Sequence, residues 1–290
     1  MSSSGLLQNY PNSLEEPIAI PIGNRLSARL YADSRPHYLE TASIQKGLVL
    51  MIGNKELIEE GVGFGVPVVK YTDKTYFSSS ASVAHIRTEG SALKFEKTFV
   101  LDTVSRKRFW RTGYINDELY SHLHKSFERL YLSHENLSTY FNKMMEFREA
   151  TKIKTEFEKV KPKGWVTVSY ELQFSKLSVS VDFTKLDLDD CIELLILNEQ
   201  GSKFFAKYAD SSGLKLIGNK IGAWHPVQAN QATLMNQNEQ IKFSLRKASS
   251  SSLFRGWEQT KNRFSWAGLS YSLQPSNREF DYTIELTLNG

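Results

Sequence analysis

The chain has 290 residues, of which 40% are hydrophobic and 23% charged, a composition typical of a folded globular protein and not of a disordered one. Its 36 basic side chains barely outnumber its 32 acidic ones, and so small an excess argues against a nucleic-acid-binding protein. A single cysteine excludes an intrachain disulfide.

The sequence also lacks targeting and cofactor motifs. Residues 1–17 contain no basic segment followed by an apolar one, and no window reaches the roughly 18 apolar residues of a membrane span. We therefore expect no membrane association and a cytoplasmic location. No metal-binding or nucleotide-binding signature is present, so we expect no metal and no cofactor. The oligomeric state stays open.

The first third of the chain is strand-like. Short apolar runs between residues 25 and 101 are separated by turn signals such as Gly53-Asn54 and Asp73-Lys74. The sequence GVGFG at 61–65 lacks the spacing and the following helix of a phosphate-binding loop. It predicts a strand in which glycine permits a bulge or a close backbone approach.

The middle of the chain has a different periodicity. Apolar residues at helical spacing predict a helical hairpin inserted at about 116–158. Pro162 and Gly164 interrupt this pattern, which predicts a linker at 159–165. Two organisations remain open: a single large β-domain over 1–290 with a helical insertion, or two β-rich halves, 1–160 and 161–290.

The last 126 residues alternate between apolar and polar side chains. Residues 165–174 and 177–183 predict an antiparallel hairpin, and strands are expected at 241–245, 267–273 and 280–288. The apolar run at 191–198 lacks alternation, which predicts a central strand covered on both faces. We interpret Ser249–Ser252 as a flexible loop. The fold class is therefore mainly β, a large antiparallel β-sandwich with an inserted helical hairpin.

Aromatic, acidic and basic side chains gather in the segment 253–271. A carbohydrate site needs flat aromatic rings for the apolar face of a sugar, with carboxylate and guanidinium groups for its hydroxyls. The candidate sugar-binding residues are Trp224, Arg255, Trp257 and Trp266, and Glu258 lies among them. The alternative is structural, because large aromatic residues also fill cores and neighbouring Arg and Glu side chains pair on surfaces.

The long antiparallel strands, the corner IGAWHPV and the terminal strand FDYTIEL together resemble the β-supersandwich of galactose-mutarotase-like proteins, mainly over residues 164–290. The resemblance implies a sugar bound on the concave face of a curved sheet, and acid–base chemistry by a histidine with a carboxylate. It implies His225 as the acid and Glu199 or Glu258 as the base. A second histidine of such a site is not identifiable, since neither His37 nor His85 has a matching context.

Two functions follow from these observations. The first is a carbohydrate-binding protein with a carbohydrate ligand, which as an enzyme would be mutarotase-like or lyase-like; whether it is catalytic stays open. The alternative is a non-catalytic protein-interaction or scaffold protein, because no catalytic motif is complete and the predicted helices at 116–158 would meet a partner.

Overall fold

The computed structural model describes residues 18–21, 26–30, 34–36, 43–58, 61–89, 92–110, 113–115, 119, 122–123, 146–147, 149, 151–173, 175–259 and 265–288. The chain divides into two compact units, Met1–Thr103 with Lys161–Gly290, and Val104–Val160. The first unit contains the candidate site. Within the described residues, no helix is long and apolar enough to cross a membrane.

Two small sheets come first among the described residues. The first has four strands in the order β1-β2-β5-β6, and the second pairs β3 with β4. Their bounds are β1 (Ile18–Pro21), β2 (Leu26–Leu30), β3 (Ser34–Pro36), β4 (Ser43–Gln45), β5 (Val49–Ile52) and β6 (Lys55–Glu56).

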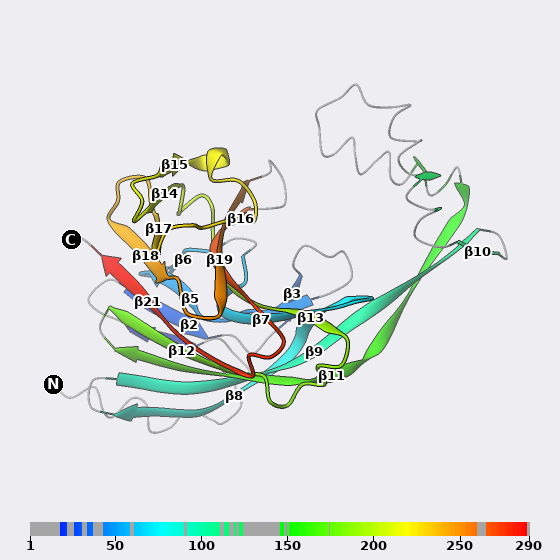
Figure 1. Ribbon diagram of the computed structural model, residues 1–290, viewed down its shortest axis with the longest axis horizontal. Coiled ribbons are helices and arrows are strands. Elements are labelled where there is room, and N and C mark those ends of the chain that lie inside the picture. The colour runs from blue at the N-terminus through cyan, green and yellow to red at the C-terminus, as the bar shows by residue number, and fades with distance from the viewer. Residues whose placement is uncertain are drawn as a thin grey trace. The chain divides into compact units, whose positions relative to one another are not determined.

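Among the described residues, a large sheet of 15 strands follows, in the order β15-β14-β17-β18-β21-β12-β11-β9-β8-β7-β13-β20-β19-β16, with β10 paired to β9 (Figure 1). The strands are β7 (Gly63–Tyr71), β8 (Thr75–Glu89), β9 (Ala92–Trp110), β10 (Gly113–Ile115), β11 (Ile153–Gln173), β12 (Lys176–Asp182), β13 (Cys191–Gln200), β14 (Lys207–Asp210), β15 (Lys215–Ile217), β16 (His225–Pro226), β17 (Gln231–Met235), β18 (Ile241–Arg246), β19 (Ser251–Gln259), β20 (Ser265–Leu273) and β21 (Glu279–Leu288). A 3₁₀-helix, η2 (Gly218–Ile221), links β15 to β16. The prediction of a mainly β protein with a large antiparallel sheet is confirmed.

The sheet turns back on itself, so that its two arms pack face to face. The ring of Phe64 on β7 lies 5.1 Å from that of Phe243 on β18, and the ring of Tyr271 on β20 lies 5.0 Å from that of Tyr282 on β21. The Tyr282 hydroxyl donates to Asn198 Oδ1 on β13 at 2.8 Å. The face of β13, β20 and β19 that meets β18 and β21 is called the inner face below, and the opposite face is the outer face.

The periodicity in the sequence explains the burial of the strands. Side chains of β12 alternate between exposed and buried, as the pattern predicts for a half-buried strand. The last seven residues of β13 are all buried, because β7 and β20 flank this strand and both of its faces are covered. Both predictions are confirmed.

The glycines at 61–65 produce a bulge, as predicted. The pairing of β13 with β7 shifts register between Leu197 and Asn198, where β7 carries the extra residue Gly65. Gly65 has φ +76°, and a Cβ there would lie 2.7 Å from the Tyr170 hydroxyl oxygen. That hydroxyl donates to the carbonyl oxygens of Phe64 at 3.0 Å and Gly65 at 3.2 Å. The close approach of β11 to β7 therefore depends on glycine.

The linker predicted at 159–165 is wrong, because β11 runs without interruption from Ile153 to Gln173. Gly164 has φ +127° and bridges Leu186, so it forms an irregularity inside a strand. Pro162 is exposed, and the fixed φ of proline fits extended backbone where no ladder hydrogen bond is required. The Ser249–Ser252 segment also differs from the predicted flexible loop, since Ser251 and Ser252 belong to β19.

The structure does not support a helical hairpin over 116–158. Most of this segment lies outside the described residues, and no complete α-helix occurs among those described. Single positions such as Leu119, Leu123 and Phe147 have helical backbone, whereas the residues from Ile153 onward are strand.

Candidate functional site

Six of the predicted site residues gather where β16, β19 and β20 pair. His225 on β16 lies opposite Arg255 on β19, and Glu258 on β19 lies opposite Trp266 on β20. The Trp257 backbone N–H donates to the Gly222 carbonyl at 2.8 Å, which ties the loop before β16 to β19. Trp224 lies in that loop.

Strand alternation divides these residues between the two faces of the sheet. Residues opposite each other in an antiparallel pair share a face, and neighbours along a strand alternate. Arg255 and Trp257 therefore share the inner face with His225, the partner of Arg255. Glu258 and its partner Trp266 share the outer face.

The inner-face residues hold the loop and the 3₁₀-helix in place. Arg255 Nε donates to the Ile221 carbonyl at 3.0 Å, and its guanidinium group lies 5.1 Å from the centre of the Tyr208 ring. Trp257 Nε1 donates to the Ser202 carbonyl at 3.3 Å. Burial, together with the hydrogen bond to Asp210, raises the pKa of Tyr208, so this ring stays neutral beneath the guanidinium group. These contacts give Arg255 and Trp257 a structural role.

On the outer face, Trp266 is the centre of a small aromatic cluster. Its side chain is 2% exposed, and its Nε1 donates to Glu258 Oε2 at 3.0 Å. The ring lies over Gly256, where a Cβ would be only 2.2 Å from the Trp266 Cη2 atom. The Trp224 ring is 5.6 Å away at a 39° tilt. We call Trp224, Trp266 and Glu258 the aromatic cluster.

Trp224 has an unusual backbone conformation for its size. It has φ +55° and is 41% exposed. A bulky residue rarely adopts a left-handed backbone, which costs about 1–3 kcal/mol unless the surrounding structure enforces it. Here β16, the Gly222–Trp257 hydrogen bond and the Trp266 ring hold the loop, so an exposed indole is presented at a fixed place.

Glu199 lies apart from these residues. It is on β13 and fully buried, opposite Gly63 and Gly268. Its Oε2 accepts a hydrogen bond from the Val62 backbone N–H at 3.3 Å. Since Gly268 is opposite Gly256, Glu199 shares the outer face with Trp266 but is closed to solvent.

The structure therefore does not place His225 against either carboxylate that the resemblance implies. His225 lies on the inner face, where its ring packs against Gly222, while Glu199 and Glu258 lie on the outer face. Of the other histidines considered, His85 is exposed on β8 with Nε2 3.9 Å from Glu96 Oε2, and His37 is outside the described residues. Within those residues, no group of histidine, cysteine and acidic side chains could hold a metal ion.

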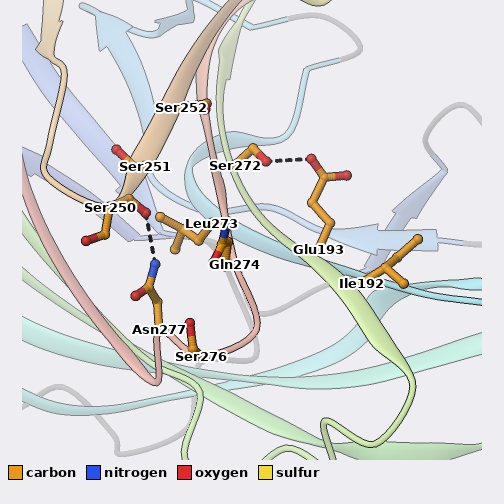
Figure 2. Close-up of a pocket in the computed structure, with 10 residues that line it drawn as sticks. All are labelled: Ile192, Glu193, Ser250, Ser251, Ser252, Ser272, Leu273, Gln274, Ser276 and Asn277. Atoms are coloured by element: carbon orange, nitrogen blue, oxygen red, sulfur yellow. Dashed lines mark hydrogen bonds between the residues drawn. The ribbon is translucent and has the colours of Figure 1, made fainter.

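A polar pocket of about 670 Å³ lies at the far end of β19 and β20 (Figure 2). It is lined by Ile192, Glu193, Ser250, Ser251, Ser252, Ser272, Leu273, Gln274, Ser276 and Asn277. The sequence reasoning missed this pocket, because the serine run was interpreted as a loop. The alternation at 267–273 does predict that Ser272 lies in a strand. It does not predict which residues lie opposite Ser272 on the neighbouring strands.

Glu193 is the charged residue among those that line the pocket. Its Oε2 lies 2.6 Å from Lys70 Nζ, and its Oε1 accepts a hydrogen bond from Ser272 Oγ at 2.5 Å. Burial opposes ionisation of this carboxyl, but the hydrogen bonds from Lys70 and Ser272 outweigh it, and the pKa of Glu193 is lowered. Across the pocket, Asn277 Nδ2 donates to the Ser250 carbonyl at 2.9 Å (Figure 2).

No protein-family model and no curated protein matches this sequence. Among solved structures, the chain is similar to an α-N-acetylgalactosaminidase from Bifidobacterium bifidum in complex with GalNAc, with 4% identity and a TM-score of 0.48 over 95% of this chain and 36% of that one. It thus spans about a third of that enzyme's length.

Structural neighbours also include a galactose mutarotase-like protein from Lactobacillus casei, with 10% identity and a TM-score of 0.41 over 94% of this chain and 100% of that one. A Synechocystis protein has 8% identity and a TM-score of 0.38, covering 97% of this chain and 99% of its own. The second neighbour is described as galactose mutarotase-like, which is the family named for the resemblance in the sequence. With every TM-score below 0.5, these neighbours establish neither an activity nor a ligand.

Proposed function

We propose that the protein binds carbohydrate at the aromatic cluster of Trp224, Trp266 and Glu258. The observation that carries this proposal is Trp224, an indole that is 41% exposed on a backbone with φ +55°. Strained residues held by their surroundings concentrate at ligand sites. An exposed, fixed indole offers the flat apolar surface on which the C–H face of a sugar stacks.

The neighbouring groups fit the same ligand. Trp266 fixes one side of the platform at 5.6 Å from Trp224. Glu258 accepts the Trp266 N–H through Oε2, which leaves the rest of this half-buried carboxylate to accept hydrogen bonds from sugar hydroxyls. The proposed role is binding. An acid–base step between His225 and Glu199 has no support in this geometry, because the imidazole and the buried carboxylate lie on opposite faces.

The test is a titration of the full chain with a panel of mono- and disaccharides, followed by the tryptophan indole N–H signals in ¹⁵N NMR spectra. The chain has 5 tryptophans, so the signal missing from Trp224→Ala assigns Trp224 directly. That signal should shift on addition of the bound sugar. Trp224→Ala should weaken binding about two- to tenfold, since an aromatic contact contributes about 0.5–1.5 kcal/mol.

Trp165→Ala is the matched control, because Trp165 is 46% exposed but lies on β11, outside the cluster. It should leave the affinity unchanged. The proposal fails if no sugar in the panel shifts the Trp224 signal at roughly 10 mM, ten times the concentration at which a weak 1 mM complex is half formed. It also fails if Trp165→Ala weakens binding as much as Trp224→Ala.

A further inference from the structure

The polar pocket at the far end of β19 and β20 is a second place where a ligand fits. It shares no lining residue with the aromatic cluster. Its volume of about 670 Å³ is within the roughly 300–1,000 Å³ of small-molecule sites. The pocket is therefore large enough for a small-molecule ligand, and its lining residues determine which kind of ligand fits.

Three segments far apart in the sequence build its walls. Ser252 on β19 lies opposite Ser272 on β20, and β20 in turn pairs with β13, which carries Glu193. The turn between β20 and β21 adds the third wall, fixed by the hydrogen bond from Asn277 Nδ2 to the Ser250 carbonyl. Buried Leu273 lies between them (Figure 2). The pocket is thus shaped by three paired strands and by a turn that a hydrogen bond holds in place.

The pocket presents no uncompensated charge. The Glu193 carboxylate is matched by Lys70 Nζ at 2.6 Å, and Ser272 donates to its other oxygen. An anionic ligand would meet this carboxylate, and a cationic one would have to compete with Lys70. An uncharged ligand meets neither obstacle.

Hydroxyl and amide groups dominate the remaining lining. Ser272 donates its hydroxyl hydrogen to Glu193 and Ser251 donates to the Ala248 carbonyl at 2.8 Å, so both hydroxyl oxygens remain as acceptors for a ligand. Asn277 keeps a second N–H and its Oδ1. The side chains of Ser252, Gln274 and Ser276 make no hydrogen bond with the described part of the chain. Donors and acceptors thus stand close together around the cavity.

We infer that this pocket binds a small uncharged polyhydroxylated ligand, of monosaccharide or cyclic polyol size, as a site separate from the aromatic cluster. Such a ligand has hydroxyls that both donate and accept, which matches the mixed lining. The pocket offers no aromatic platform, so hydrogen bonds alone select the ligand. The inference needs neither Trp224 nor Trp266 and goes beyond the proposed function.

The experiment is isothermal titration calorimetry on the full chain, with D-galactose and myo-inositol as uncharged probes and inorganic phosphate as the charged one. Two variants fill the pocket from opposite sides, Ser252→Leu and Ser276→Leu, both at exposed positions. The control is Ser180→Leu, an exposed strand serine on β12 outside the pocket. Circular dichroism verifies that each variant is folded.

At least one uncharged probe should bind the wild type and Ser180→Leu with equal affinity, and its binding to the pocket should remain in Trp224→Ala. Ser252→Leu and Ser276→Leu should each weaken it by at least about tenfold, because the leucine side chain occupies the volume that the ligand needs. Binding lost in Trp224→Ala but kept in both leucine variants would overturn the inference while supporting the aromatic cluster. No binding of either polyol at roughly 100 mM, or preferential binding of phosphate, would also overturn it.

Discussion

Gly256→Ala tests whether the aromatic cluster is assembled as described. A Cβ at this position would lie 2.2 Å from Trp266 Cη2 and 2.4 Å from Cζ3. Carbon atoms in contact are about 3.5–4.0 Å apart, so the indole must retreat by about 1.3 Å or more. Trp266 is 2% exposed, so the atoms packed around the ring oppose this movement.

The expected cost follows from the contacts that this movement disturbs. Overpacking a filled site costs about 1–3 kcal/mol. The hydrogen bond from Trp266 Nε1 to Glu258, at 3.0 Å, has a charged acceptor, and such bonds contribute about 1.5–3 kcal/mol. Replacing glycine with alanine regains about 0.4–1 kcal/mol through the unfolded chain. Gly256→Ala should therefore lower the free energy of unfolding by about 2–4 kcal/mol.

The assay is guanidinium chloride unfolding followed by far-UV circular dichroism, with near-UV spectra to follow the Trp224–Trp266 pair. A second background, Trp266→Leu, removes the ring that the new methyl group would meet. In that background Gly256→Ala should cost less than about 1 kcal/mol, which gives a coupling free energy of about 1–3 kcal/mol between the two sites. Equal costs in the two backgrounds would refute the contact between Gly256 and Trp266, as would an unchanged near-UV spectrum of Gly256→Ala.

Three further outcomes follow from the core and the pocket. Gly65→Ala should destabilise the fold by about 2–4 kcal/mol in urea unfolding, because φ +76° disfavours alanine and its Cβ would lie 2.7 Å from the Tyr170 hydroxyl; a loss below about 0.5 kcal/mol would contradict the close approach. Burial raises the pKa of Tyr170 and Tyr271, so their contribution to stability is complete below the unfolded pKa of about 10 and is lost as pH rises above it. As pH rises, tyrosinate absorbance should therefore increase in two phases, and the phase of the buried tyrosines should coincide with loss of the far-UV circular dichroism signal. A single phase in a chain that stays folded would disprove the raised pKa values. Burial opposes ionisation of Glu193, but the hydrogen bonds from Lys70 and Ser272 outweigh burial and lower the pKa of Glu193. The stabilisation from this carboxylate is therefore present above an unfolded pKa of about 4.3 and is lost as pH falls through the lower folded pKa. Glu193→Gln should make the denaturation midpoint less sensitive to pH below the unfolded pKa of about 4.3. Equal sensitivity in wild type and variant would argue against the Lys70–Glu193 ion pair.

The sequence predicts where this protein forms strands better than it predicts where those strands end. Alternation identifies β12 and the absence of alternation identifies β13, because burial on one face or on both leaves a direct mark on composition. Pro162 and Gly164 do not end a strand, although such residues often end an element. Gly164 bridges Leu186 across the sheet, and such pairing lets the strand continue through these two residues. The local sequence around Pro162 and Gly164 does not reveal which residue will pair with them.

The candidate site was predictable in part for the same reason. The sequence brings Arg255, Trp257 and Glu258 together along one segment, and strand alternation already puts Glu258 on the other face from its two neighbours. The position of Trp224 depends on a two-residue strand, β16, which is too short to leave a periodic signal. The pocket depends on pairing between β13, β20 and β19, so the proximity of Glu193, Ser272 and Ser252 appears only when the sheet order is known.

A row of residues across the outer face explains why the aromatic cluster and the buried Glu199 occur in one sheet. Gly63, Glu199, Gly268 and Gly256 lie opposite one another on successive strands, so that three of four positions in the row lack a side chain. A Cβ at Gly268 would lie 3.0 Å from Glu199 Cγ, and one at Gly256 would meet Trp266. The space left by these glycines is therefore occupied by side chains from neighbouring positions that lie across the sheet. Glycine in the interior of a strand weakens the strand. Here the missing side chains leave the volume that the Trp266 ring occupies, and the Trp266 ring in turn positions Trp224.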